Sequence, residues 1–444
     1  MSDAAFEETA RKGRLYRMIW CWHFYAGLFC IPFVIFLAVT GSVYLFRPQI
    51  ESVIDRAYMN IPRSGQAHGA DMIANAAIAA APGSKLAAYI LPETPNQAVQ
   101  VLISEHGART RVYVHPDTLS ILKSVDEEGR FRRIVFKLHG ELLMGPAGSV
   151  LVELAASWAI VMVLSGLYLW WPRNTRGLGG VLYPRLTKKY VWRDLHAVIG
   201  VYVSIFALFL LATGLPWALV WGEAFKAARN VTGTAAILQD WSTSSAGEHA
   251  EHMAQDHDQL APNTGGASLE MIVASAQRLH LAAPVAISPP TSRFPYWKVS
   301  SEAANRPLRA TVWLSPSTGE IVARERFADR HWIDQIVGYG TAAHEGQLFG
   351  WANQLLGLLT AMGLVVLCIS AFVMWRKRAP EDALGAPPPI PDERIGAGLA
   401  AIIIVAGVLL PVLGVCMIAI AFTEQLLLRR WAAARTWLGL SPRH

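Results

Sequence analysis

Charged residues are scarce in this chain. Asp, Glu, Lys and Arg make up only 16% of its 444 residues, whereas 53% of the residues are hydrophobic. Soluble domains average about 25% charged residues, so the composition excludes an ordinary soluble protein. It indicates a chain that crosses a membrane several times.

Cysteine is absent from the polar regions. All four cysteines lie in apolar segments, at Cys21, Cys30, Cys368 and Cys416, so the polar regions hold no disulfide, although an oxidising compartment would allow one. The motif C-x-x-C-H does not occur, which excludes the usual covalent attachment of a c-type haem. G-x-G-x-x-G and P-loop motifs are missing too, so the sequence shows no nucleotide site.

What the sequence does contain is a set of long apolar segments. A membrane span needs about 20 mostly apolar residues, and five segments meet this length: 18–46, 149–171, 195–221, 351–375 and 396–422. The basic lead of the first segment resembles a signal peptide, but its apolar run is too long and no cleavage site follows. We therefore predict an integral membrane protein, an α-helical bundle with an uncleaved N-terminal anchor.

The short basic loops predict the orientation, because Lys and Arg near span ends stay in the cytoplasm. The cytoplasmic parts would be the tail 1–17 and the loops 172–194 and 376–395. The long regions 47–148 and 222–350 would then lie outside, in the periplasm of a Gram-negative cell. The net charge of +6 is explained by these loops and by anionic lipid headgroups, so the lipid bilayer is the expected partner and nucleic acid is not.

The fifth apolar segment gives conflicting signals. Pro411 lies near its middle, and the tail 423–444 is basic although one more crossing would place it outside. We expect a single crossing, with a hairpin as the alternative. The sequence does not determine the path of residues 396–444.

The chain contains an internal duplication. Residues 23–41 align without a gap with residues 196–214, and residues 138–145 with the span that follows them align with residues 343–350 and the next span. The matched residues include His23, Thr40, His139 and Ser165, which fall on His196, Thr213, His344 and Ser370. The bundle therefore consists of two repeated span pairs plus a fifth C-terminal span.

The two outside regions repeat as well. The stretches 111–124 and 311–324 each consist of two alternating apolar runs around a turn that contains Pro and Thr, which is typical of a hairpin. Stretches with helical spacing precede them. We therefore expect each outside region to be a small α+β unit.

The duplication brings four histidines into two pairs. His23 and His196 lie just inside the cytoplasmic face, and His139 and His344 lie at the outer ends of two spans. Two neutral imidazoles that face each other are the axial ligands that an iron porphyrin needs. All four are therefore candidate metal ligands, against the alternative that they are interfacial hydrogen-bonding anchors. Basic residues at the rims are candidate partners for haem propionates: Arg17 and Arg193 inside, and Arg132 and Arg133 outside.

A second histidine group lies in the second outside region. His249, His252 and His257 stand beside Glu and Asp, a set that could capture a divalent metal ion. The segment is polar and has no counterpart in the first half, so we interpret it as a solvated loop. Whether these histidines bind metal is left open.

The duplicated units, with "WCWHFYAGL" and "WRDLHAVIG" at their starts and "LHGELLMG" and "AHEGQLFG" before their second spans, resemble the PepSY-associated transmembrane family. That family includes inner-membrane ferric-siderophore reductases and iron-uptake factors. The resemblance implies a membrane core with two non-covalent b-type haems on His23, His139, His196 and His344, and two periplasmic PepSY-like units. In one respect the chain departs from the hairpin pattern, because Leu119 stands where the second copy has Gly319.

The resemblance also implies an enzyme that reduces Fe(III) in a siderophore complex to Fe(II). Electrons would cross an apolar layer about 30 Å thick by an inner haem on His23 and His196 and an outer haem on His139 and His344, and a membrane quinol or a separate reductase would donate them. Two alternatives are a PepSY-type binding or regulatory module on a membrane anchor, and a metal or proton transporter that uses its intramembrane histidines. The sequence leaves open which siderophore is used, which donor, and the oligomeric state.

Overall fold

The computed structural model describes residues 3–172, 177–234, 266–292, 294–387 and 396–440. It divides into two compact units, which are treated separately below. The helical unit comprises Met1–Ser42, His139–Ala227 and Leu356–His444, and the sheet unit comprises Val43–Leu138 and Ala228–Leu355.

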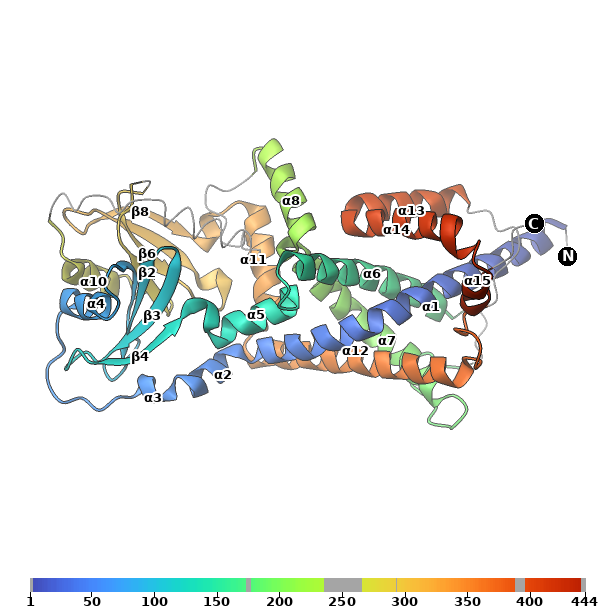
Figure 1. Ribbon diagram of the computed structural model, residues 1–444, viewed down its shortest axis with the longest axis horizontal. Coiled ribbons are helices and arrows are strands. Elements are labelled where there is room, and N and C mark those ends of the chain that lie inside the picture. The colour runs from blue at the N-terminus through green and yellow to red at the C-terminus, as the bar shows by residue number, and fades with distance from the viewer. Residues whose placement is uncertain (1–2, 173–176, 235–265, 293, 388–395, 441–444) are drawn as a thin grey trace. The chain divides into compact units, whose positions relative to one another are not determined.

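Within the described residues, five helical segments are long and apolar enough to cross a membrane. They are Gly13–Leu45 of α1 (Asp3–Leu45), α6 (Pro146–Trp170), Val191–Trp217 formed by α7 (Val191–Gly214) and η2 (Leu215–Trp217), α12 (Trp351–Arg378), and Pro411–Leu428 formed by α14 (Pro411–Thr423) and η5 (Glu424–Leu428). These helices make the chain a multi-pass membrane protein (Figure 1).

The stretch 396–422, expected to be a single crossing, consists of two helices in the structure. α13 (Ala397–Leu409) has 13 residues and is therefore about 20 Å long, too short for the apolar layer. It ends at Leu410, whose φ of −125° and ψ of 81° lie outside the helical region, and α14 then begins with Pro411, which needs no N–H partner at that position. A Cβ on Gly414 would lie 2.5 Å from the carbonyl oxygen of Gly407. The chain therefore folds back here, with two helix backbones in contact (Figure 1).

The sheet unit is built from two copies of a helix followed by four strands. The first copy is α4 (Ala70–Ala79), β1 (Lys85–Ile90), β2 (Val99–Glu105), β3 (Ala108–Val114) and β4 (Ile121–Asp126). The second copy is α10 (Leu269–Arg278), β5 (Val285–Ser288), β6 (Trp297–Ser301), β7 (Ala310–Leu314) and β8 (Ile321–Arg326). The duplication seen in the sequence is thus repeated in the order of these elements.

The two copies share one sheet. Its eight strands have the order β4-β3-β2-β1-β5-β6-β7-β8, and all neighbours are antiparallel. The join lies between β1 and β5, where Tyr89 pairs with Ile287 and Ile90 pairs with Ala286. Each outside region thus contains a helix and four strands, as expected, and the strands of both regions join in one continuous sheet.

One face of this sheet carries the main apolar core. Alternate strand residues such as Val101, Val112 and Val299 are fully buried there, together with Ile272 from α10 and Ile73 from α4. The alternation follows from the two-residue period of strand side chains. Both helices thus cover the same face of the sheet (Figure 1).

The hairpin turns of the two copies have the same backbone conformation. Leu119 has a φ of 58° and Gly319 a φ of 68°. Glycine adopts this left-handed region freely, whereas for leucine it costs roughly 1–2 kcal/mol. The first copy therefore has the same turn as the second, although it has Leu119 where the second has Gly319.

Other short helices complete the described chain. They are α2 (Arg47–Ile54), α3 (Arg56–Met59), η1 (Glu127–Gly129), α5 (Phe131–Glu141), α8 (Leu219–Val231), η3 (Arg306–Leu308), η4 (Phe327–Asp329), α11 (Trp332–His344) and α15 (Ala432–Leu438). Two of them carry candidate histidines, since His139 lies in α5 and His344 ends α11.

Candidate functional site

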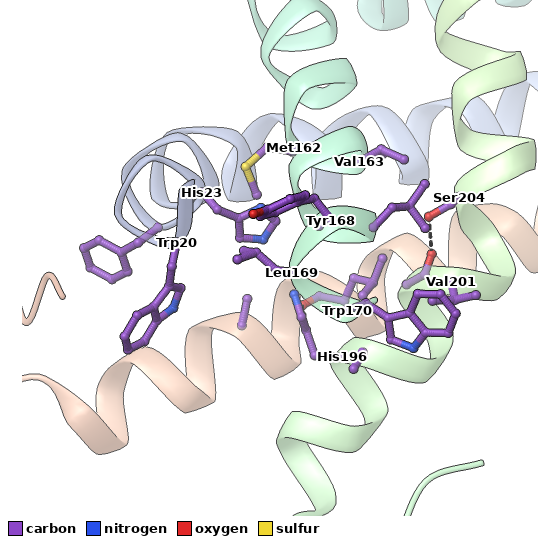
Figure 2. A pocket seen from close by; sticks show the side chains of 18 of the residues that line it. Trp20, His23, Met162, Val163, Tyr168, Leu169, Trp170, His196, Val201 and Ser204 are labelled. Atoms are coloured by element: carbon purple, nitrogen blue, oxygen red, sulfur yellow. Dashed lines mark hydrogen bonds between the residues drawn. The ribbon is translucent and has the colours of Figure 1, made fainter. Parts of the chain in front are cut away.

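His23 from α1 and His196 from α7 lie close together in the helical unit. Their ring centroids are 6.4 Å apart, and the ring planes cross at 86°. Both line a cavity of about 1880 Å³ whose walls come mainly from α1, α6, α7 and α12. Figure 2 shows the two imidazoles on this cavity, with Met162 and Leu169 nearby. The structure thus brings together the inner pair that the duplication singled out.

The spacing of the two rings fits a shared iron. A metal–imidazole bond is about 2 Å long, and a ring nitrogen lies about 1 Å from the ring centre, so two axial imidazoles have centres roughly 6 Å apart. The observed 6.4 Å matches this value. The cavity also exceeds the range of about 300–1,000 Å³ that is typical of small-molecule sites, so its volume suffices for a porphyrin.

Both histidines form a hydrogen bond at Nδ1. Nδ1 of His196 lies 3.1 Å from the carbonyl oxygen of Leu367, and Nδ1 of His23 lies 2.9 Å from Oγ of Ser165. A carbonyl oxygen only accepts hydrogen bonds, so Nδ1 of His196 carries the proton. Its Nε2 keeps the lone pair that a metal ligand needs.

The glycines that follow the two histidines lie at helix contacts and also line the cavity. A Cβ on Gly27 would lie 3.1 Å from the methyl carbon of Met162, and one on Gly200 would lie 3.5 Å from a methyl carbon of Leu367. The first distance is tight and the second is an ordinary contact. Gly27 therefore permits close packing of α1 against α6, whereas Gly200 is not required by packing alone.

The cavity is electropositive. Arg14, Arg193 and Arg378 line it, and no Asp or Glu is found among its described lining residues. The guanidinium of Arg378 lies 5.4 Å from the ring centre of Trp20 and 5.2 Å from that of Phe24. Such a site favours an anionic ligand, and guanidinium groups are suited to bind carboxylates such as propionates.

The sequence identified only one of these three arginines. Arg193 was predicted, and it also forms an ion pair of 3.1 Å with Asp194. The predicted Arg17 is not among the residues that line the cavity. Arg378 belongs to the basic stretch 376–395 that predicts the orientation, and its position at the end of a span is the one signal in the sequence for a role in the cavity.

His139 lies against the C-terminal end of α1 in the helical unit. Its Nδ1 lies 2.9 Å from Oγ1 of Thr40, and a Cβ on Gly41 would lie 3.1 Å from its Cε1. Thr40 therefore holds this imidazole by a hydrogen bond, and Gly41 leaves room for it because it has no side chain. His344 belongs to the sheet unit, so its pairing with His139 stays a prediction.

Glu345, which follows His344, is a partly buried counter-ion in the sheet unit, with 12% of its side chain exposed. It forms ion pairs of 3.5 Å with Arg47 and with Arg306. Burial opposes ionisation of this carboxyl, but the guanidiniums of Arg306, Arg47 and Arg309 outweigh burial and lower its pKa. Glu345 is therefore charged, and its negative charge balances the arginines around it.

The predicted outer rim arginines are bound to carboxylates. Arg132 forms an ion pair of 3.1 Å with Glu127, and Arg133 one of 2.9 Å with Glu128. Both acids lie in η1, one turn before α5. These guanidiniums therefore anchor the start of the helix that carries His139.

One intramembrane carboxylate was missed by the sequence reasoning. Glu153 of α6 is 2% exposed and accepts hydrogen bonds from the backbone N–H groups of Val220 and Trp221, at 2.9 and 3.1 Å. Those N–H groups belong to the first turn of α8, which lacks intrahelical partners. Glu153 therefore caps α8 and is not part of the histidine cavity.

The remaining histidine group, His249, His252 and His257, lies outside the described residues. In the part of the chain that the structure describes, no group of three or more His, Cys, Asp or Glu residues could hold a metal ion. The two-imidazole arrangement at His23 and His196 is thus a different kind of candidate site, because a porphyrin brings its own four nitrogen ligands.

Comparison with known proteins agrees with the architecture. A protein-family model described as the PepSY-associated TM region matches residues 20–378. The match includes His23, His139, His196 and His344 and ends before α13. No curated protein matches the chain.

Proposed function

Because this chain belongs to the PepSY-associated transmembrane family, we propose that it is a bacterial inner-membrane oxidoreductase with two b-type haems. Its substrate is a ferric siderophore, and a membrane quinol or a separate reductase is the electron donor. Siderophores bind through hard oxygen donors, which hold Fe(II) more weakly than Fe(III). Reduction therefore releases the iron for uptake.

The inner histidine pair carries this proposal. His23 and His196 have the ring spacing of two axial ligands, and both hold Nδ1 in a hydrogen bond that leaves Nε2 for the metal. They lie on a large cavity with arginines and without acidic lining residues in the described chain. The spacing and tautomer of the two imidazoles and the volume and charge of the cavity thus all suit a haem.

A b-type haem supplies a one-electron Fe(III)/Fe(II) couple when bound. The chain's own residues would hold and orient it: the imidazoles of His23 and His196 would bind the iron, and the guanidiniums of Arg378 and Arg193 would pair with the propionates. Apolar residues such as Met162 and Leu367 line the rest of the cavity. No acid–base residue is needed, because iron reduction requires only electron delivery.

The outer site is proposed from the duplication. His139 and His344 hold equivalent places in the two repeats, and His139 has its Nδ1 bonded to Thr40, as His23 has to Ser165. We assign these two histidines to the second haem. The N-terminus would be cytoplasmic and the sheet unit periplasmic, as the basic end of α12 at Arg376–Arg378 supports.

The experiment is the absorption spectrum of the protein purified from haem-replete cells. We expect a reduced-minus-oxidised spectrum of six-coordinate b-type haem, with two haems per chain. His196→Ala should lose one haem, and the matched control His68→Ala, a histidine of the sheet unit, should lose none. In proteoliposomes with reductant enclosed, the wild type should reduce an external ferric siderophore. A colourless protein would refute the proposal and favour a binding module or a transporter.

A further inference from the structure

Three candidate histidines share one kind of hydrogen bond. In each, Nδ1 meets a hydroxyl of a neighbouring helix, and the pairs are His23–Ser165 at 2.9 Å, His196–Ser370 at 3.2 Å and His139–Thr40 at 2.9 Å. Ser165 and Ser370 occupy equivalent positions in the duplicated sequence. The contact is therefore a repeated feature of the chain.

Each hydroxyl also donates to a carbonyl of its own helix. The bonds are Ser165 to Met162 at 3.2 Å, Ser370 to Leu367 at 2.9 Å and Thr40 to Phe36 at 2.9 Å. Because the hydroxyl hydrogen is used in that bond, the oxygen is left as an acceptor toward the imidazole. Nδ1 of each histidine therefore carries the proton. For His196 the carbonyl of Leu367 gives the same answer independently.

We propose that Ser165, Ser370 and Thr40 are positioning residues that act on the iron through the imidazoles they hold. A partner on Nδ1–H fixes the tautomer and the ring orientation and makes Nε2 a more basic ligand. A more basic ligand favours Fe(III) over Fe(II), so these hydroxyls keep the reduction potential low. The inference rests on the proposed function, because it assigns these hydroxyls to haem-ligating histidines.

The two inner histidines differ in how far they depend on the hydroxyl. His196 has a second acceptor, the carbonyl of Leu367 at 3.1 Å, whereas within the described residues Ser165 is the hydrogen-bond acceptor of Nδ1 of His23. Loss of Ser370 thus leaves an acceptor in place, and loss of Ser165 does not. The Ser165 variant should show the larger effect.

The test is a redox titration of the purified holoprotein, followed by absorbance. Loss of such a partner typically changes metal affinity by about 10–100-fold, and we expect Ser165→Ala to weaken Fe(III) relative to Fe(II) about tenfold. For a one-electron couple this is a rise of about 59 mV. Ser370→Ala should show a smaller rise. The control is Ser204→Ala, whose hydroxyl lines the same cavity but donates to the carbonyl of Gly200 (Figure 2) and should leave the potential unchanged.

Two further variants separate the hydrogen bond from packing. Ser165→Thr keeps the hydroxyl and Ser165→Val has the same bulk without it, so only the valine variant should shift the potential, even if Ser165→Ala does not fold. A haem-loaded wild type with no shift in the alanine and valine variants overturns this inference alone. A wild type without haem overturns the proposed function as well.

Discussion

Asp71 and Glu270 each cap the helix that carries the other. The carboxylate of Asp71 in α4 accepts from the backbone N–H groups of Leu269 and Glu270, both at 3.2 Å, and the carboxylate of Glu270 in α10 accepts from the N–H of Ala70. The two helices of the duplicated unit are thus joined at their N-termini. Negative charge there also interacts favourably with both helix dipoles.

We therefore expect Asp71→Ala and Glu270→Ala each to destabilise both helices. The loss of one cap costs about 1 kcal/mol, and each variant leaves N–H groups of the partner helix without their acceptor. Hydrogen exchange should accelerate in the first turns of α4 and α10 together. Glu105→Gln, at an exposed carboxylate of β2, is the control and should leave both helices protected. Faster exchange in only the mutated helix would contradict the reciprocal cap.

Arg229 and Asp334 form a buried ion pair between α8 and α11. Their side chains are 2% and 5% exposed, and one of their two hydrogen bonds measures 2.9 Å. Removal of one partner leaves a buried charge uncompensated, so Asp334→Ala should cost about 3–5 kcal/mol, measured as a lower midpoint of thermal unfolding. The exposed pair Arg326–Asp329 is the control, because Asp329→Ala there should cost about 0–1 kcal/mol. Equal effects would show that burial does not decide the strength of the pair.

Glu127 makes the stability of the sheet unit depend on pH. Burial alone would raise its pKa, but Arg111, Arg132 and Arg130 outweigh burial and lower the pKa from 4.5 to about 2. Because the pKa of Glu127 is lower in the folded state than in the unfolded state, the ionised carboxylate stabilises the fold at pH values above the unfolded-state pKa. This contribution, on the order of 3 kcal/mol, disappears as the pH falls through the folded-state pKa. The unfolding free energies of the wild type and Glu127→Gln should therefore converge between pH 4.5 and 2. A constant difference across this window would contradict the assignment.

Much of the fold follows from periodicity and duplication, and the exceptions have identifiable causes. Four of the predicted spans are helices, because apolar runs of that length have few alternatives in a membrane. The sharing of one sheet could not be predicted, since the pairing of Tyr89 with Ile287 joins edges far apart in the chain. The duplication also hides differences: Glu127 and Arg111 form an ion pair in the first copy, where the second has Phe327 and Thr311.

The sequence predicted which residues belong to the candidate site, but not which of them are in contact. The duplication matched His23 with His196 and Ser165 with Ser370. The sequence of an apolar helix does not show, however, which side chain such a serine contacts. The rotation of each helix about its axis decides which side chain meets which imidazole, and this rotation depends on packing between helices.

The fold-back of α13 onto α14 predicts the side on which the chain ends. If α13 and α14 enter and leave the membrane together as a hairpin, reporter domains placed after residue 387 and after residue 440 should lie on the same side of the membrane, whereas a single crossing by Pro411–Leu428 would separate them. Gly414→Leu should disrupt the contact with Gly407, because a Cβ there already lies within 2.5 Å of its carbonyl oxygen. Gly398→Leu is the control, since nothing lies within 4 Å of its Cβ. Reporters on opposite sides in the wild type would refute the hairpin.

Arg378 should contribute to haem binding through its charge. Its guanidinium lies on the cavity, held over the rings of Trp20 and Phe24, and charged hydrogen bonds contribute about 1.5–3 kcal/mol. Arg378→Gln should therefore weaken haem binding by roughly tenfold or more, measured by haem titration of the haem-depleted protein. Arg376→Gln is the matched control, because Arg376 belongs to the same basic end of α12 but does not line the cavity, and its affinity should not change. Equal losses in both variants would attribute the effect to the general charge of the helix end, and no loss in either would remove Arg378 from the binding site.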